Sequence, residues 1–377
     1  MYLYRSVVVF PLFRLDAEEI EKISLCWLGL EFHIKNKLYD KKKILFFLMG
    51  LLLVGTITVV AAEVMIRFVS PQRSMYPRWE FSSRYGFEPF ESTEMVHTLP
   101  GQWRYIYSIN EYRYRGEAVP ISDRYRETNI VVLGDSYTFG QGVQDNEVYT
   151  AVMQRILSPD FSVINLGVGG WGLTQQIRRY YEFGRLYEPR FVILQFSSND
   201  PSDNVRDRVT IVEDGRFRFQ EAGGSTNHLR KYLSRSIIFQ KSQLYNLFRD
   251  AGYAFVNRSV MEDAQQELAL DHDRGVPDEE QLYNELLEVF AKSLHERGVD
   301  LIVMAVEEQL SSFPHIRDKV LDLESEGHLL YVDTAEWFDW SPGLPGHYEE
   351  AMSPEGHWGE EAHRLIGTKL SEIVLGL

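Results

Sequence analysis

The second half of the chain alternates short apolar runs with helical patterns. Val148, Val152 and Ile156 recur at a spacing of four residues, as on one face of a helix, and a similar pattern runs from 282 to 294. The runs that indicate buried strands are residues 130–133, 161–164, 191–196, 301–306 and 329–332. Strands that alternate with helices pair in parallel through right-handed crossovers. The pattern therefore predicts an α/β domain, a three-layer α/β/α arrangement around a parallel sheet of about five strands.

The first half contains a different pattern, an uninterrupted apolar stretch. Residues 44–62 carry no charged side chain. As a helix they would span about 28 Å at 1.5 Å per residue, close to the hydrocarbon thickness of a bilayer. A buried core helix of a soluble protein is the alternative, but such a helix usually keeps one polar stripe. The stretch predicts one transmembrane helix.

The charges that flank this stretch indicate an orientation. Five lysines lie between residues 35 and 43, whereas the arginines after the span are more dispersed and are mixed with Glu63 and Glu80. The positive-inside rule then favours a single-pass protein of the inner (cytoplasmic) membrane with its N-terminus inside and its catalytic domain extracytoplasmic. A cleaved signal peptide ending at 60–62 is the alternative. The region before it is unusually long for a signal, which favours an uncleaved anchor.

The pattern divides the chain into four parts. Residues 201–277 separate one strand from its next helix by an unusually long polar stretch, which indicates a cap or lid inserted over a site. The predicted parts are an N-terminal cytoplasmic segment (1–43), a transmembrane anchor (44–62), a membrane-proximal linker with accessory strands (63–127, one of them near 107–110), and an α/β domain (128–377) that contains the insertion.

Composition narrows the function classes. The net charge is −16, which argues against nucleic acid as a partner, because phosphates require lysine and arginine. The single cysteine, Cys26, excludes an intrachain disulfide and a cysteine-based metal site. The histidines, His347 and His363 among them, show no metal-binding spacing and are expected at the surface or in packing. No metal and no organic cofactor are predicted.

The first candidate for chemistry follows the first strand of the α/β domain. Gly134-Asp135-Ser136 comes directly after the apolar run 130–133 and just before a helical pattern. Ligands of open α/β sheets bind outside the carboxyl ends of the strands. Ser136 is therefore a candidate nucleophile, provided that a base can reach it. The same tripeptide is also a common turn, since Asp and Ser hydrogen-bond to their own backbone.

Polar residues also follow the next two strands. Asn165 precedes four glycines that lie between residues 167 and 172, where positive φ and a close backbone approach to a ligand are possible. This stretch lacks the patterns of phosphate-binding and dinucleotide-binding loops. Asn199 follows the third strand, and its amide could donate a hydrogen bond to an oxyanion, although Asn-Asp also suits a turn.

A histidine and a carboxylate precede the last helix. His357 lies in the loop before that helix, and Glu355 stands two residues earlier. In an extended segment such residues project to the same side. A carboxylate beside a histidine can fix its tautomer and stabilise the imidazolium.

Together, these four stretches resemble the blocks of the SGNH, or GDSL-like, hydrolase superfamily across residues 128–377. The resemblance implies a flavodoxin-like SGNH hydrolase fold. It also implies an acyl-transfer mechanism in which Ser136 is the nucleophile and His357 is the general base. The implied oxyanion hole consists of the backbone N–H groups of Ser136 and Gly170 and the side-chain amide of Asn199, with Asp135, Asn165 and Asp200 as supporting residues.

The sequence departs from the family pattern at two positions. Ser197 stands where the third block usually has glycine. The family commonly carries Asp three residues before the histidine, and here that residue is Pro354. Many bacterial members place the acid two residues before the histidine instead, and Glu355-Gly356-His357-Trp358 resembles that variant with Glu for Asp. Glu355 is therefore the expected triad acid, on a side chain one methylene longer.

The resemblance favours a membrane-anchored serine esterase. Its expected substrate is an ester, with an O-acetylated carbohydrate as the first choice, because membrane-anchored bacterial relatives often modify exported polysaccharides. An O-acetyltransferase that acts on an exported polysaccharide would need the same residues. A non-catalytic protein that keeps the fold and binds a glycan or a partner is the third possibility. The oligomeric state is not indicated by the sequence.

Overall fold

The computed structural model describes residues 41–121, 129–222, 236–252, 279–338 and 351–377. The chain forms two compact units, Met1–Ala61 and Ala62–Leu377. The predicted N-terminal segment, the domain boundary predicted at 128 and His347 lie outside the described residues.

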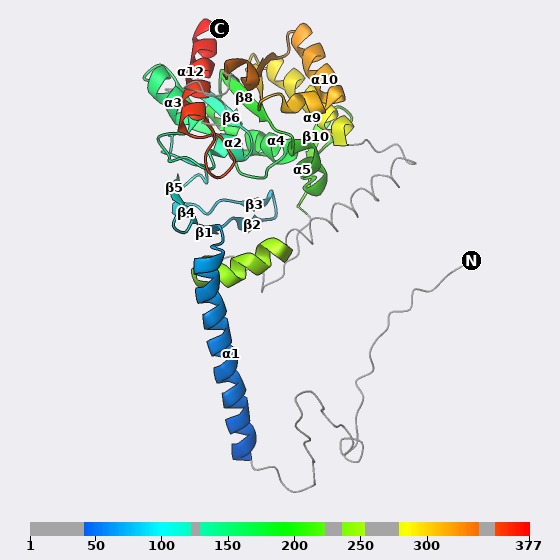
Figure 1. The fold of residues 1–377 in the computed structure, drawn as a ribbon. Coiled ribbons are helices and arrows are strands. Elements are labelled where there is room, and N and C mark those ends of the chain that lie inside the picture. The colour runs from blue at the N-terminus through cyan, green and yellow to red at the C-terminus, as the bar shows by residue number, and fades with distance from the viewer. Residues whose placement is uncertain (1–40, 122–128, 223–235, 253–278, 339–350) are drawn as a thin grey trace, which may run out of the picture. The chain divides into compact units, whose positions relative to one another are not determined.

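Helix α1 (Lys41–Val69) contains the uncharged stretch (Figure 1). Between Lys43 and Val69 it is long and apolar enough to cross a membrane. Within unit 1, none of the described side chains from 43 to 61 is buried, so this stretch is not a core helix. The helix continues seven residues beyond the predicted end of the span at Ala62.

The second unit is built around a five-stranded sheet in which all neighbouring strands are parallel. Its strands are β6 (Asn129–Leu133), β7 (Ser162–Asn165), β8 (Phe191–Phe196), β11 (Asp300–Ala305) and β12 (Leu330–Asp333). They lie in the order β12-β11-β8-β6-β7, the flavodoxin-like arrangement. The sequence-based prediction of a parallel five-stranded sheet is confirmed, with strand ends within one or two residues.

Helices cover both faces of the sheet, because successive side chains of a strand point to opposite faces. In β6, Val131 and Leu133 pack against one helical layer, and Ile130 and Val132 pack against the other. The first layer holds α4 (Leu173–Glu182), α9 (Glu279–His295) and α10 (Pro314–Ser325), and the second holds α3 (Tyr149–Leu157) and α12 (Glu360–Gly376). The predicted three-layer α/β/α architecture is confirmed (Figure 1).

The region predicted as an insertion contains regular structure in its described parts. Helix α5 (Asp200–Arg206) follows β8, and the hairpin of β9 (Thr210–Glu213) and β10 (Arg216–Phe219) packs on the core of the first layer. The helix predicted from 229 to 248 is described from residue 236 onward. It consists of α7 (Ile237–Lys241) and a second helical stretch, 243–252, separated by Ser242.

Short turns of helix separate the strands from the longer helices. They are α2 (Ser136–Phe139), η3 (Gly184–Tyr187), η4 (Gln309–Ser312) and η5 (Thr334–Trp337). The helix predicted for 173–183 ends at Glu182. Gly184 begins the 3₁₀ turn η3 and does not itself cap the helix.

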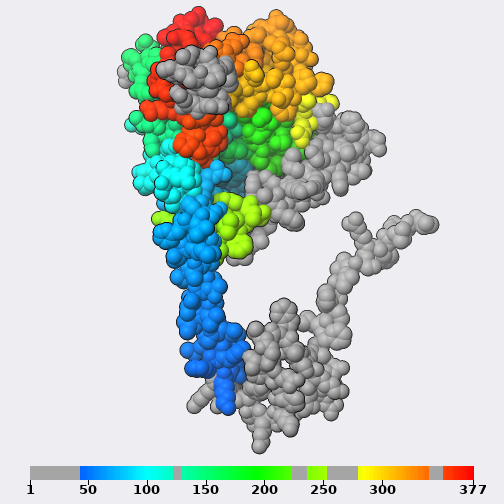
Figure 2. Space-filling model, viewed as in Figure 1, coloured from blue at the N-terminus to red at the C-terminus, as the bar shows by residue number. Residues whose placement is uncertain are grey.

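Among the described residues, five strands precede the large sheet and are called the accessory strands here. Strands β1 (Ser74–Tyr76), β4 (Thr93–Leu99) and β5 (Trp103–Ile109) form one antiparallel sheet, and β2 (Glu80–Ser82) and β3 (Gly86–Glu88) form a hairpin. Their apolar side chains share a small core with Phe139 of α2. The accessory strands therefore pack directly against the segment that follows β6. Figure 2 shows them (cyan) next to the loop 351–359 before α12 (orange-red).

Candidate active site

Ser136 is placed by the sharp turn at the end of β6. A Cβ at Gly134 would collide with Thr138 and with the carboxamide of Gln195, so only glycine fits there. Asp135 then caps α2, because its carboxylate accepts a hydrogen bond from the N–H of Tyr137 at 3.0 Å. Ser136 is the first residue of that helix, and its N–H has no acceptor within it. The turn thus presents both the hydroxyl and a free N–H of Ser136.

The loop that carries His357 is a tight turn. The N–H of Gly356 donates to the carbonyl of Ser353 at 3.0 Å, and the N–H of Ser353 donates to the carbonyl of His357 at 2.7 Å. Gly356 has φ +87°, which favours glycine. The expectation of an extended segment was wrong, because the glycine between Glu355 and His357 folds the chain back on itself.

Ser136 and His357 meet although they are 221 positions apart in the sequence. The Nε2 atom of His357 lies 2.9 Å from the Oγ atom of Ser136, within hydrogen-bond distance. The imidazole also packs against the ring of Tyr137, with 5.0 Å between the centroids. A serine hydroxyl within reach of an imidazole is the arrangement that activates a serine nucleophile.

Glu355 lies on the other side of the imidazole. Its side chain is fully buried, and its Oε2 atom is 3.6 Å from Nδ1 of His357. Within the part of the chain that the structure describes, neither of these two buried atoms has a hydrogen-bond partner. Catalytic hydrogen bonds are often long without substrate, so a small closing movement would satisfy both atoms. The backbone carbonyl of Glu355 also faces the ring and favours its protonated form.

The second carboxylate oxygen of Glu355 is surrounded by donors. Its Oε1 atom lies 2.9 Å from Nε2 of Gln141, 3.1 Å from Nε2 of His97 and 3.2 Å from a guanidinium nitrogen of Arg73. None of these three residues was predicted from the sequence. They come from the loop after α2, from β4 and from the segment before β1, and no local motif marks them.

Burial shifts the protonation of both groups. It raises the pKa of Glu355 from its ordinary value of 4.5 to about 7, against the opposing effect of Gln141 and Arg73. Burial lowers the pKa of His357 below 6.5, partly opposed by the carboxylate of Asp135. His357 is therefore predominantly neutral at pH 7, as a general base must be.

The strand order brings the expected oxyanion donors to the same edge as Ser136. β6 lies between β7 and β8, and all three are parallel, so the residues that follow them meet at one edge of the sheet. Gly170 follows β7 with φ +80°, and its N–H has no acceptor among the described residues. Asn199 follows β8 and donates one amide hydrogen to Asp203 at 2.7 Å, which leaves its second amide hydrogen available.

Two residues that the sequence did not indicate connect these donors. Asp203 accepts from the amide of Asn199 and forms an ion pair with Arg206. Arg206 in turn donates to the carbonyl of Gly170 at 2.7 Å. Asp203 and Arg206 thereby link the side-chain donor to the backbone donor, and they lie about one and two turns of α5 beyond Asn199.

The remaining motif residues form a buried polar layer beneath Ser136. Asn165 donates to the carbonyl of Thr138 at 2.7 Å, and so holds the serine helix from below. Ser197, which replaces the usual glycine, donates its hydroxyl toward Asp135 at 2.8 Å and lies 2.9 Å from Oδ1 of Asn199. The carboxylate of Asp200 accepts from the N–H of Ser197 at 3.1 Å, and burial raises the pKa of Asp200.

Other features of the second unit do not join this site. His363 is fully buried and accepts from the N–H of Tyr149 at 3.1 Å, so it is a packing residue. Among the described residues, no group of three His, Cys, Asp or Glu could hold a metal ion.

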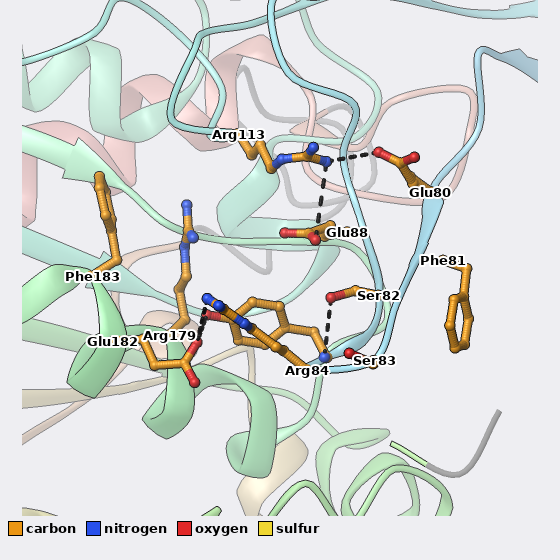
Figure 3. Close-up of a pocket in the computed structure, with 11 residues that line it drawn as sticks. Glu80, Phe81, Ser82, Ser83, Arg84, Glu88, Arg113, Arg179, Glu182 and Phe183 are labelled. Atoms are coloured by element: carbon orange, nitrogen blue, oxygen red, sulfur yellow. Dashed lines mark hydrogen bonds and ion pairs between the residues drawn. The ribbon is translucent and has the colours of Figure 1, made fainter. Parts of the chain in front are cut away.

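A cavity of about 500 Å³ lies between β2, β3 and α4 (Figure 3), and neither Ser136 nor His357 lines it. Its charged side chains point toward one another. Arg113 pairs with Glu80 at 3.0 Å, and Arg84 pairs with Glu182 at 3.6 Å. The charged groups of the lining therefore largely pair with one another.

A flavodoxin-like α/β/α domain with a serine and a histidine in contact at the sheet edge defines the class of SGNH hydrolases. Residues 132–365 match the model of the GDSL-like Lipase/Acylhydrolase family. This match covers more than half of the 377 residues, and the chain belongs to that family. The protein is accordingly a hydrolase that acts on ester bonds.

The chain is also similar, at low sequence identity, to solved structures of esterases. The psychrotrophic esterase EstA from Pseudoalteromonas sp. is 12% identical, covers 66% of this chain and 97% of its own, and has a TM-score of 0.38. The aryl esterase of M. smegmatis is 13% identical, with coverages of 66% and 99% and a TM-score of 0.35. A two-domain esterase active on acetylated mannans is 14% identical, with coverages of 66% and 49% and a TM-score of 0.37. No curated protein matches the sequence.

Proposed function

We propose that this protein is a membrane-anchored, extracytoplasmic serine esterase of the SGNH type that removes the acyl group, most simply acetyl, from a carbohydrate or another small ester. The observation that carries the proposal is the 2.9 Å contact between His357 Nε2 and Ser136 Oγ. The buried carboxylate of Glu355 behind the imidazole supports the assignment of a triad.

The chemistry proceeds by acyl transfer through Ser136. As its Oγ atom attacks the ester carbonyl, Nε2 of His357 takes the hydroxyl proton, and Glu355 stabilises the imidazolium that forms. The N–H groups of Ser136 and Gly170 and the amide of Asn199 bind the tetrahedral oxyanion, and each such donor typically lowers the barrier by about 3 kcal/mol. His357 then gives its proton to the leaving alcohol, which departs and leaves an acyl-serine.

The second half of the reaction reverses these roles with water. His357 deprotonates a water molecule that attacks the acyl-serine carbonyl, and the same donors bind the second oxyanion. Collapse returns the proton to Ser136 Oγ and releases the carboxylic acid. Every proton step uses His357.

Aromatic side chains beside the site support a carbohydrate ester. A Cβ built on Gly169 would lie 3.6 Å from Cβ of Ser136 and 3.5 Å from the indole of Trp79, and one built on Gly170 would lie 3.6 Å from the ring of Phe87. Both rings are only partly buried. Trp79 and Phe87 therefore offer apolar surfaces near the nucleophile, and such surfaces can stack on the face of a sugar ring.

The proposed location rests on the charge-free stretch and its flanks. Glu63 is the first charged residue after that stretch, and it accepts hydrogen bonds from the N–H groups of Gln243 and Leu244 at 3.0 and 2.9 Å. These contacts hold the stretch after α7 beside residues 62–69 within the second unit, and Arg67 donates to the carbonyl of Lys241 in α7 at 3.3 Å. Ile237 and Ile238 of α7 are 51% and 82% exposed, as expected for side chains that meet a lipid surface.

The esterase proposal is tested with the full-length protein in lipid nanodiscs. The wild type should hydrolyse p-nitrophenyl acetate and release acetate from acetylated oligosaccharides, and Ser136→Ala should abolish both activities. Ser325→Ala, at the exposed end of α10, is the matched control and should retain them. Activity that survives in Ser136→Ala would refute the mechanism. Faster acetyl loss on addition of an unacetylated oligosaccharide, with acetyl recovered on that oligosaccharide, would identify a transferase.

The topology is tested through Cys26, the only cysteine of the chain. A membrane-impermeant maleimide should label Cys26 only after the cells are permeabilised, whereas a cysteine introduced by Ser325→Cys should be labelled in intact cells. Labelling of Cys26 in intact cells would reverse the proposed orientation.

A further inference from the structure

The residues that hold Glu355 come largely from outside the family domain. The family match begins at residue 132, whereas Arg73 and His97 precede it and reach Glu355 from the accessory strands and the segment before them. Arg73 is 56% exposed, so solvent screens its ion pair with Glu355 and weakens it. His97 is 2% exposed and is the buried donor from this region.

The tautomer of His97 follows from its second contact. Its Nδ1 atom lies 3.0 Å from the hydroxyl of Tyr107, and that hydroxyl accepts a hydrogen bond from the N–H of Gly142 at 3.1 Å. The Tyr107 oxygen therefore uses a lone pair for Gly142 and has its proton free for Nδ1. With Nδ1 as acceptor, a neutral His97 carries its proton on Nε2, which points at Glu355.

His97 is neutral at every pH at which the enzyme would work. Burial lowers its pKa to about 3, with Arg73, Arg78 and His357 adding to the effect. Its contact with Glu355 is therefore a hydrogen bond from an uncharged imidazole to a carboxylate. The titratable groups that face Glu355 or His97 are Arg73, Arg78, Tyr105, Tyr107 and His357.

We propose that His97 is a positioning residue for the triad acid: its Nε2–H fixes Oε1 of Glu355, so that Oε2 of Glu355 faces Nδ1 of His357. The chain of contacts then runs from Gly142 through Tyr107, His97, Glu355 and His357 to Ser136. Gly142 itself lies six residues after Ser136, so the chain closes on the loop of the nucleophile. This inference rests on the proposed esterase function.

The longer acid explains why such support is needed. Glutamate has one more rotatable bond than the aspartate usual in this family, and that bond must be held for Oε2 to meet the imidazole. In this protein, Oε1 of Glu355 is held by three donors while Oε2 is left without any in the described structure. The carboxylate is thereby oriented, with its open oxygen directed at His357.

The test compares His97→Phe with His97→Gln. Phenylalanine fills the space but removes both nitrogens, whereas the glutamine amide can still donate to Glu355. For p-nitrophenyl acetate, His97→Phe should lower kcat about tenfold to a hundredfold, with KM changed less than about twofold, as for other supporting hydrogen bonds at active sites. The acid limb of kcat/KM should move to higher pH, because the ionised form of Glu355 loses a donor. His97→Gln should restore kcat to within about threefold of wild type.

The same substitution of His97 in the Glu355→Gln variant separates positioning of the acid from general structural support. In Glu355→Gln the carboxylate is gone, so adding His97→Phe should change kcat less than about twofold. If His97→Phe lowers kcat equally in both backgrounds, or leaves the pH limb and kcat of the otherwise wild-type protein unchanged, the positioning role is refuted.

A readout without turnover keeps this inference distinct from the proposed function. The imidazole of His357 can be titrated by NMR in the full-length protein and in His97→Phe. His97→Phe should shift the titration of His357, because the carboxylate beside it is no longer held. If the wild type hydrolyses no ester but this shift occurs, the esterase proposal fails while the positioning role stands. An unchanged His357 titration refutes the positioning role, whatever the activity.

Discussion

The family domain and the accessory strands contribute to the active site in different ways. In the family domain, Ser136, Gly170 and Asn199 each follow a buried parallel strand, and the order of those strands brings them together. The accessory strands contribute no group that reacts. They contribute His97, which lies on the seven-residue strand β4 and contacts the acid. In the proposed mechanism, the reacting groups thus lie at the edge of the parallel sheet, while the support for the acid comes from strands that precede the family match.

Arg115 joins the two regions. Its guanidinium is buried and donates to the carbonyls of Phe139 and Val143 at 2.9 and 2.7 Å, on the segment after Ser136. It also pairs with Asp145 at 2.7 Å, and Asp145 accepts from the N–H of Ser108 in β5 at 3.0 Å. The buried guanidinium of Arg115 therefore holds the segment after Ser136 and the accessory strands together. Substitutions in the family domain and in the accessory strands can separate what each region contributes to activity and stability.

The largest effect is expected within the family domain. His357→Ala should lower kcat by about 10⁴- to 10⁶-fold, because the general base is lost, and Glu355→Ala should lower it by about 10²- to 10⁴-fold, because loss of a triad acid costs less than loss of the base. Both are measured with p-nitrophenyl acetate. Equal losses would mean that Glu355 does more than orient and stabilise the imidazole, and full activity in Glu355→Ala would assign the acid elsewhere.

Replacing Arg115, which joins the two regions, should lower the stability of the protein as well as its activity. Arg115→Met keeps much of the side-chain volume but leaves Asp145 and the carbonyls of Phe139 and Val143 without their donor. Each buried carbonyl left without its donor costs about 1–3 kcal/mol, and together they should lower the melting temperature by about 10 °C in a domain of this size. Thermal unfolding measures the change, and Arg104→Met on the exposed side of β5 is the control. Equal melting temperatures for the two variants would show that the regions are held together by apolar packing alone.

The pH dependence of kcat/KM tests whether Glu355 works together with the general base His357. The active form needs neutral His357 and ionised Glu355, so kcat/KM should rise with pH, through a limb near pH 7 set by the raised pKa of Glu355. In Glu355→Gln only His357 remains, and burial lowers its pKa, so the limb should move below pH 6.5 while the plateau falls. A limb that stays near pH 7 in Glu355→Gln would show that Glu355 does not govern it.

The contrast between the family domain and the accessory strands also explains which features could be predicted from the sequence. The five strands of the large sheet were found because a strand buried on both faces is a continuous apolar run. Ser136, Asn199 and His357 were found because each stands in a short local motif. The accessory strands alternate weakly, and only the end of β5 was anticipated. His97 could not be found, because its partner lies more than 250 residues away and no local pattern joins them.

Glu355 shows both what the sequence could predict about a residue and what it could not. Its position two residues before His357 was found from the motif, but the turn around Gly356 was not, because a positive φ is a conformational choice that glycine allows and does not require. The burial of its side chain was not foreseen either, since the buried surface around it belongs to another part of the chain. The residue was predictable, whereas its electrostatic environment was not.

That environment predicts a smaller effect, on stability. The folded-state pKa of Glu355 is raised from 4.5 to about 7, so below pH 4.5 the carboxyl is protonated in both the folded and the unfolded chain and costs nothing. As the pH rises from 4.5 to about 7, folding opposes an ionisation that the unfolded chain permits, and stability is lost, by at most about 3 kcal/mol. Glu355→Gln carries no charge at any pH. Its stability relative to wild type should therefore be near zero at pH 4 and should increase toward pH 8.

Urea unfolding at pH 5 and pH 8 measures this difference, with Glu94→Gln on the exposed side of β4 as the control that should show no such increase. If the stability of Glu355→Gln relative to wild type is the same at both pH values, Gln141, His97 and Arg73 together offset the burial, and Glu355 is ionised across this range. The acid limb of activity would then belong to His357 and lie below pH 6.5 in the wild type. If the relative stability of Glu355→Gln increases from pH 5 to pH 8, the ionised Glu355 that assists His357 lowers the folding stability. The accessory strands, through His97, then limit that loss.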